Sequence, residues 1–240
     1  MSLVWRHSGR PRPFSRLQRG LSLVELMVGI AVGLFVVAGA VMVVATQLGD
    51  NRRLLLDTQL QQDLRATLDI VTRELRRSGS VAEASALASL WQEGSATVVE
   101  NNLAGIELNE AGNEIVFRYR RAGNEGPYGF KRDGGVIKSL LGAGWQDLTD
   151  GNVMAVTAFT VTPDAEDPPV PPVQIPCPRL CADGTSDCWP KLVVRSYTVD
   201  ISAQSRSDPA VQRTMRSVVR VRNDLVQFDE ALPPNQACPA

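Results

Sequence analysis

The stretch that decides the fold runs from Leu26 to Ala45 and reads LMVGIAVGLFVVAGAVMVVA, with no charged residue. A helix of that length spans about 30 Å, which is the thickness of the hydrocarbon core of a bilayer. Soluble helices are seldom so uniformly apolar, so the stretch predicts one membrane-spanning helix. Two alternatives share this feature. One is a cleaved secretory signal peptide, whose apolar stretch is usually about 7–15 residues; the other is a simple signal anchor.

The charges around this stretch predict its orientation. Residues 1–20 contain five arginines and no acid, whereas only Arg52 and Arg53 follow closely on the far side. The N-terminus is therefore expected in the cytoplasm and the rest of the chain outside it. The whole chain has 25 Lys+Arg against 26 Asp+Glu, so the part after residue 20 is acidic by 6 charges. This acidity disfavours binding to nucleic acid.

Glu25 lies just before the apolar stretch and interrupts the hydrophobic run from Leu21 to Met27. A carboxylate at the centre of a membrane span costs about 2.5–3.5 kcal/mol, so such residues usually have a partner. The alternative interpretation places Glu25 near the cytoplasmic interface, where that cost is smaller. The string around Glu25 is Arg19-Gly20-Leu21-Ser22-Leu23-Val24-Glu25-Leu26. In it a basic leader ends at a glycine, and an apolar helix follows directly.

This string resembles the class III leader junction of type IV pilins and related pseudopilins. The resemblance implies that a prepilin peptidase cleaves between Gly20 and Leu21 and that Leu21 becomes the N-methylated first residue. Glu25 is then fifth from the new terminus, where it would neutralise the terminal amine of a neighbouring subunit and set the register of assembly. The chain departs from the family at Leu21, where phenylalanine is most common.

Two glycines in the apolar stretch have a spacing that favours helix packing. Gly29 and Gly33 form a G-x-x-x-G pattern, and small residues at this spacing let helices approach closely. The plainer interpretation is that glycine is simply common in membrane helices.

The helical period continues beyond Gly49-Asp50-Asn51, which we predict to be a soft point. Apolar residues recur every three or four positions and form one stripe: Leu56, Leu60, Leu64, Leu68, Val71 and Leu75. Gly79 is expected to end the helix. The natural cover for this stripe is the chain's own C-terminal domain.

Past residue 80 the sequence changes to short β-type runs separated by turn signals. The predicted strands are Ala96–Glu100, Gly105–Leu108, Glu114–Arg120, Tyr128–Arg132, Val136–Leu140, Val153–Thr162, Leu192–Ala203 and Thr214–Arg222. The last two are expected to form a terminal hairpin. Residues 163–190 are rich in proline and predict an extended surface loop.

A long helix followed by antiparallel strands predicts an α+β fold. The expected architecture is the pilin-like ladle, in which a membrane half and an amphipathic half of one N-terminal helix precede, and pack on, a C-terminal antiparallel β-sheet. The predicted parts are a cleaved basic leader (1–20), a transmembrane or filament-core helix (21–48), an amphipathic periplasmic half (49–79) and a β-rich globular domain (80–240).

All four cysteines lie in the part expected to be exported: Cys177, Cys181, Cys188 and Cys238. Two disulfides suit an oxidising periplasm, and three pairings are open. We favour Cys181–Cys188 within the loop and Cys177–Cys238 at the tail. A zinc site made of four thiolates is the alternative. The run Asp183–Asp187 suggests calcium, but it lacks the spacing of an EF-hand loop and is better interpreted as a polar turn.

The sequence gives little support for catalysis. Its one histidine, His7, lies in the leader, which excludes Ser-His-Asp, Cys-His and histidine–metal chemistry from the exported part. We therefore predict a protein that is not an enzyme and needs no cofactor or metal.

The chain is most similar to PilW-like minor pilins of type IV pili, most strongly over residues 16–77 and more weakly over Ser217–Asn223. The resemblance implies a structural subunit that helps prime pilus assembly. Its partners would be prepilin peptidase, other minor pilins, the major pilin and an inner-membrane assembly platform. It would be a single-pass inner-membrane protein with a periplasmic domain, and later part of the fibre. The alternatives are a minor pseudopilin of a type II secretion system and a membrane-anchored periplasmic binding or enzyme domain.

Overall fold

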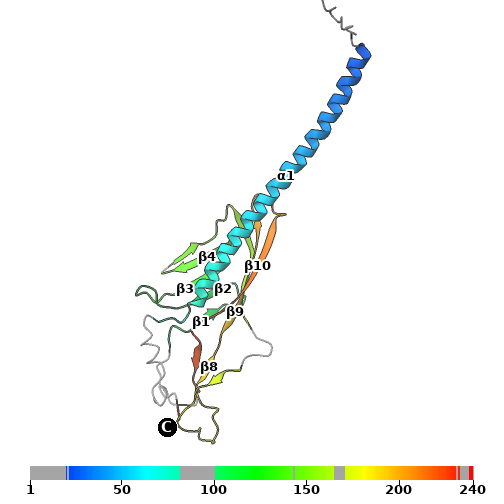
Figure 1. The fold of residues 1–240 in the computed structure, drawn as a ribbon. Helices are drawn as coiled ribbons and strands as arrows, with labels where there is room; N and C mark the ends of the chain where they lie inside the picture. The colour runs from blue at the N-terminus through cyan, green and yellow to red at the C-terminus, as the bar shows by residue number, and fades with distance from the viewer. Residues whose placement is uncertain are drawn as a thin grey trace, which may run out of the picture. The chain divides into compact units, whose positions relative to one another are not determined.

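The computed structural model describes residues 20, 22–81, 101–142, 144–164, 171–230, 232 and 238–239. Within them, one long helix is followed by strands in three antiparallel sheets, so the predicted α+β class is confirmed (Figure 1). The chain divides into two compact units, Met1–Asn51 and Arg52–Ala240.

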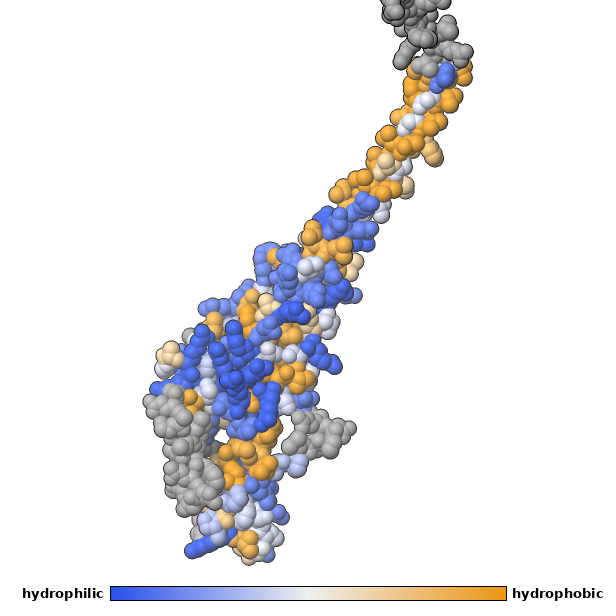
Figure 2. All heavy atoms as spheres, in the orientation of Figure 1, coloured by the Kyte–Doolittle hydropathy of each residue, from blue (hydrophilic) through white to orange (hydrophobic). Residues whose placement is uncertain are grey.

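Helix α1 spans Leu23–Arg76 as one continuous element. The helix continues without a break through the predicted soft point at Gly49-Asp50-Asn51, as the helical period beyond it predicted. A single glycine weakens a helix by only about 1 kcal/mol relative to alanine and does not remove a backbone donor, as proline would. In the first unit, every described residue of α1 is exposed. Figure 2 shows this part of the helix as a mostly hydrophobic surface.

The part of α1 in the second unit packs on the sheets through the predicted stripe. Five stripe residues are buried and belong to the main hydrophobic core: Leu60, Leu64, Leu68, Val71 and Leu75. The first stripe residue, Leu56, is half-buried. Two buried hydroxyls on the same side, of Thr67 and Thr72, donate to helix carbonyls four residues earlier at 2.7 and 2.8 Å, so their burial leaves no donor unpaired.

The end of α1 is fixed to the following strands. Gly79 has φ +77°, a left-handed conformation that favours glycine, and its N–H donates to the Arg118 carbonyl at 2.8 Å. The Tyr119 hydroxyl donates to the Glu74 carboxylate in a short hydrogen bond. These contacts confirm the predicted helix stop and place the last turn of α1 beside the chain that follows β2.

The first sheet is a meander in the order β1-β2-β3-β4-β5. Its strands are β1 (Ile106–Leu108), β2 (Glu114–Phe117), β3 (Tyr128–Asp133), β4 (Val136–Leu141) and β5 (Gly144–Asp147). Strand β2 ends three residues before the predicted end at Arg120, and β5 was not predicted. Ile115, Phe117 and Phe130 from this sheet are buried in the same core as the α1 stripe.

The second sheet has the order β10-β9-β6, with β6 (Met154–Pro163), β9 (Ser196–Ser205) and β10 (Gln212–Arg220). Burial alternates residue by residue along β9, with Val199 and Ile201 fully buried. Strands β9 and β10 pair antiparallel, so the predicted terminal hairpin is confirmed.

The third sheet is small and corrects two predictions. It has the order β11-β8-β7, with β7 (Val173–Gln174), β8 (Lys191–Val193) and β11 (Leu225–Gln227). The predicted strand Leu192–Ala203 is in fact two strands, β8 and β9, in different sheets, because the chain leaves the β ladder at Val194 and Arg195. Residues 163–190 do not form only a loop, since β7 pairs with β8. The predicted strand Ala96–Glu100 lies outside the described residues.

Candidate functional site

The predicted cleavage junction lies at the start of α1. Gly20 is exposed, and a Cβ added to it would meet nothing within 4 Å. Leu21 and the leader before Gly20 lie outside the described residues. The described side of the junction is therefore open to a peptidase.

Ser22 begins the helix, a role that the sequence analysis missed. Its Oγ accepts the Glu25 backbone N–H at 3.1 Å, and its carbonyl accepts the Leu26 N–H at 3.1 Å. Ser22 is thus the N-cap, and Glu25 stands three residues later, as in the S-x-x-E capping box. That spacing is the signal that could have found this role.

Glu25 has two properties in this position. Its carboxylate lies in the first turn of α1, where the helix dipole favours a negative charge. It is also exposed, and it has no ion pair with any residue that the structure describes. The local fold therefore orients Glu25 at the helix start but gives its charge no partner in the described part of the same chain.

The surface that follows Glu25 is apolar and uncovered. Every described residue from Ser22 to Leu55 is exposed, including Phe35 at 82% and Met42 at 74%. Burying one such side chain contributes about 1.5–3 kcal/mol, so contact of these apolar side chains with water is unfavourable. Within the described residues, α1 is the one helix long and apolar enough to cross a membrane.

The glycines of this part of α1 are also uncovered. A Cβ added to Gly29 or Gly33 would meet nothing within 4 Å. Neither glycine is therefore needed for packing against the described residues. Their small size matters only for something that approaches the helix from outside.

The four cysteines form two disulfides. Cys177 is bonded to Cys238 and Cys181 to Cys188, which is the pairing favoured from the sequence. Sulfur atoms paired in this way are not available as thiolate ligands for zinc. The Cys177–Cys238 bond joins positions 61 residues apart and fixes the tail, where Cys238 is buried, to the proline-rich segment.

The acidic run at Asp183 forms a turn, as predicted. One carboxylate oxygen of Asp183 accepts both the backbone N–H and the hydroxyl of Thr185, at 3.0 and 2.8 Å. These hydrogen bonds hold the pKa of Asp183 below its ordinary value. Gly184 has φ +82°, which suits a tight turn.

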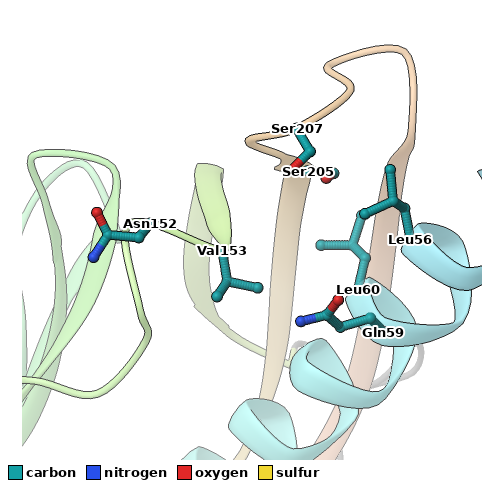
Figure 3. Close-up of a pocket in the computed structure, with 7 residues that line it drawn as sticks. All are labelled: Leu56, Gln59, Leu60, Asn152, Val153, Ser205 and Ser207. Atoms are coloured by element: carbon teal, nitrogen blue, oxygen red, sulfur yellow. The ribbon is translucent and has the colours of Figure 1, made fainter.

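A pocket of about 130 Å³ lies between α1, the β9–β10 turn and the residues before β6 (Figure 3). Its lining residues are Leu56, Gln59, Leu60, Asn152, Val153, Ser205 and Ser207. These side chains include no acid, base or cysteine. The pocket therefore has no group among its lining residues that could act as a general acid, general base or thiolate nucleophile.

The half-buried cation Arg195 was also missed by the sequence analysis. Its guanidinium donates to the carbonyls of Ala104 and Asn223, at 2.5 and 3.0 Å. Burial lowers the pKa of Arg195 from its ordinary value. This side chain holds three chain segments together at the point where β8 ends, so its role is structural.

Comparison with known families agrees with this arrangement. Residues 15–41 match the prokaryotic N-terminal methylation motif, which covers the junction, Glu25 and the first turns of the exposed helix. Together with the α+β fold, the match indicates a class III prepilin-like chain. Residues 53–221, more than half of the chain, match prepilin peptidase-dependent protein B, and the chain belongs to that family. No significant match was found among curated proteins or among solved structures.

The family assignment fixes the general class. The chain is a pilin-like protein of a type IV pilus or pseudopilus system. Families of this kind are generally structural rather than enzymatic. The exposed helix and the methylation motif fit a single-pass anchor in the inner membrane.

Proposed function

We propose that this chain is a non-catalytic minor pilin that primes or caps the assembly of a type IV pilus after cleavage between Gly20 and Leu21. One observation carries the proposal. Glu25, an acid without an ion-pair partner among the described residues, stands at the start of a helix whose described residues are all exposed as far as Leu55. A lipid bilayer or other helices must cover such a surface.

Removal of the leader (1–20) leaves the apolar helix on the mature protein and creates a cationic amine at Leu21, which remains cationic when methylated. Glu25 of one subunit neutralises the amine of its neighbour inside the apolar bundle, where charges interact strongly. A buried pair of this kind specifies register more than it adds stability. Gly29 and Gly33 provide space where neighbouring helices cross.

The proposed organisation follows from these steps. Residues 21–48 cross the membrane and later enter the filament core, residues 49–79 form the amphipathic half, and residues 80–240 form the periplasmic domain. Prepilin peptidase processes the chain, and an inner-membrane platform assembles it with other minor pilins and the major pilin. Lipid contacts are exchanged for helix contacts when the subunit enters the fibre at the cell surface.

Glu25→Gln tests the central step. Glutamine also suits the third position of a capping box, so the variant removes the charge and leaves the start of α1 intact. We expect cleavage after Gly20 to proceed normally and incorporation into filaments to fall by at least about tenfold. The variant leaves the neighbour's buried amine without an opposite charge, which costs more than about 1.4 kcal/mol. Intact mass of the membrane-extracted chain reports cleavage, and sheared filaments report incorporation.

Ser22→Ala is the matched control, because it removes the cap and keeps the charge. Its effect should be limited to the roughly 1 kcal/mol of a lost N-cap. A mature chain that begins at Met1 or beyond Ala45 contradicts the proposal, as does normal incorporation of Glu25→Gln.

Deletion of the gene separates the two filament systems. Loss of twitching motility is expected for a type IV pilus subunit. Loss of protein secretion with normal twitching would instead assign the chain to a type II secretion pseudopilus.

A further inference from the structure

The two edge strands of the second sheet, β6 and β10, differ in how their outward backbone groups are protected. At the β6 edge, turns of the first sheet supply backbone partners: the Val156 N–H donates to the Gly135 carbonyl and the Val161 N–H to the Gly112 carbonyl, both at 2.7 Å. Strand β6 also contains a register shift between Val156 and Ala158 and ends at Pro163. A bulge and a proline are both features that blunt a sheet edge.

The other edge, β10, has none of these features. It pairs with β9 over nine consecutive residues without a register shift, and its sequence QRTMRSVVR contains no proline or glycine. Among the described strands its one neighbour is β9, and β10 lies at the margin of its sheet (Figure 1). The other uncapped edge strands of the described sheets have at most four residues. Long regular edges are usually protected, because they pair readily with other chains.

The direction of the β10 backbone groups follows from the bonds that flank the β9–β10 ladder. The Val221 N–H donates to the Arg195 carbonyl and the Ser205 N–H to the Val211 carbonyl, both at 2.9 Å. These two pairs continue the register of the β9–β10 ladder at its two ends. Bonded pairs alternate along an antiparallel ladder, so the odd-numbered residues of β10 bond to β9. The backbone groups of the even-numbered residues point to the outer edge: Gln212, Thr214, Arg216, Val218 and Arg220.

The side chains of these five residues are all exposed, including Val218 at 56%. The row contains two arginines and no acid. Arg216 donates through Nε to Asp200 at 2.7 Å, yet its side chain is 71% exposed, and a guanidinium has five donors. Arg220 lies 3.6 Å from Asp224 and is 64% exposed. The outer edge thus presents backbone donors and acceptors beside a cationic row.

We propose that the outer edge of β10 binds an extended strand of a different pilin-like subunit that carries Asp or Glu opposite Arg216 or Arg220. The proposal rests on the proposed function, because the partner is another subunit of the same assembly. Main-chain hydrogen bonds give this mode of recognition its affinity, and alternate side chains give its specificity. Charge disfavours a second copy of this chain as the partner. If two copies of β10 paired antiparallel over their full length, Arg216 of one copy would lie opposite Arg216 of the other. If they paired parallel and in register, each arginine would lie beside the same arginine of the other copy.

Val218→Pro is the sharpest test. Proline there removes one outward N–H and leaves the bonds to β9 in place, because the Val218 backbone groups do not point to β9. A photo-crosslinking amino acid at Thr214, in full-length chain expressed in cells, captures the contact. We expect an adduct whose crosslinked peptide is an extended segment with Asp or Glu, and a yield at least about tenfold lower with Val218→Pro. Val218→Thr is the matched control and should keep the yield.

Two further measurements distinguish a loss of the edge contact from a folding defect and from a failure of leader cleavage. Disulfide mapping and a thermal melt show whether Val218→Pro folds; if it does not, Arg216→Glu takes its place, with the same loss of adduct expected from charge reversal. Intact mass of the same sample reports cleavage at Gly20, so failure of the proposed function is seen separately. The edge proposal is overturned by an undiminished adduct in the variant, by no adduct, by an adduct with a second copy, or by a peptide without an acid.

Discussion

The two parts of helix α1 have the same secondary structure and opposite surroundings. From Leu23 to Leu55 every residue is exposed, whereas from Leu60 to Leu75 the apolar stripe is fully covered by the sheets. In the exposed part apolar residues occur on all sides. In the covered part they recur every three or four positions, and polar residues such as Arg65 and Asp69 face solvent. The difference shows that the pattern of hydrophobic residues, and not helix formation itself, decides what each part contacts.

This difference has an energetic consequence. Side chains of the covered part contribute to the folding of the second unit, so their loss should appear in its free energy of unfolding. Side chains of the exposed part make no such contribution, and their loss should appear only in membrane insertion or assembly. Matched substitutions in the two parts therefore test whether only the covered part contributes to the free energy of unfolding.

The largest effect is expected for Leu64→Ala. Leu64 is 0% exposed, and a buried Leu→Ala change typically costs about 2–5 kcal/mol through lost transfer energy and the cavity left behind. Leu34→Ala is the matched control, since Leu34 is 66% exposed. Denaturant unfolding of the detergent-solubilised chain, followed by tryptophan fluorescence, should show no change for the control within about 0.5 kcal/mol. Equal losses for both variants would contradict the comparison.

The next effect is expected at the two kinds of glycine. Gly79→Ala places a Cβ at φ +77° and 3.1 Å from the Asn223 Cβ, so we expect a loss of about 1–2 kcal/mol in the same unfolding assay. Gly33→Ala is the control, because its Cβ meets nothing within 4 Å. That variant should leave the unfolding of the second unit unchanged and alter only helix packing in the filament. A Gly79→Ala chain as stable as the original would show that the cap relaxes.

Both parts of α1 could be predicted from sequence, because their signals are local. The apolar run, the stripe from Leu56 to Leu75 and the stop at Gly79 depend only on spacing along one helix. The Ser22 cap was equally local and was missed because Glu25 was interpreted only as an assembly residue or an interface residue, not as part of a cap. Its spacing from Ser22 fits a capping box as well.

The strands that were missed or misjudged depend on partners far away in the chain. Strands β5, β7 and β11 have two to four residues, too few for an alternating pattern to be distinguished from a turn. The end of β8 before Arg195 depends on carbonyls of Ala104 and Asn223, which no local pattern reveals. The cysteine pairing was likewise one of three open choices, since spacing alone does not fix which sulfurs meet.

Alkaline pH should affect the end of the covered part. Burial and the Glu74 carboxylate raise the pKa of Tyr119 above its ordinary value. The unfolded chain loses this proton near pH 10, whereas the folded chain keeps it to higher pH. Stability is therefore full below pH 10 and falls as the pH rises further.

Tyr119→Phe tests this dependence, because it removes the titrating hydroxyl and keeps the buried ring. Urea midpoints between pH 9 and 11 should fall less steeply in the variant. Some dependence should persist, since burial also raises the pKa of Tyr197. An unchanged slope in the variant would show that Tyr119 does not carry the effect.

The smallest effect is expected at the ion pair near the start of the covered part. Asp57 accepts a hydrogen bond from Arg213 of β10 at 2.7 Å, but the two side chains are 28% and 52% exposed. Exposed pairs contribute about 0.2–1 kcal/mol and are screened by salt. A double-mutant cycle with Asp57→Ala and Arg213→Ala should give a coupling in that range that declines in 1 M salt. A coupling above about 2 kcal/mol that persists in salt would mean that this ion pair, and not only the apolar stripe, holds the start of the covered part to the domain.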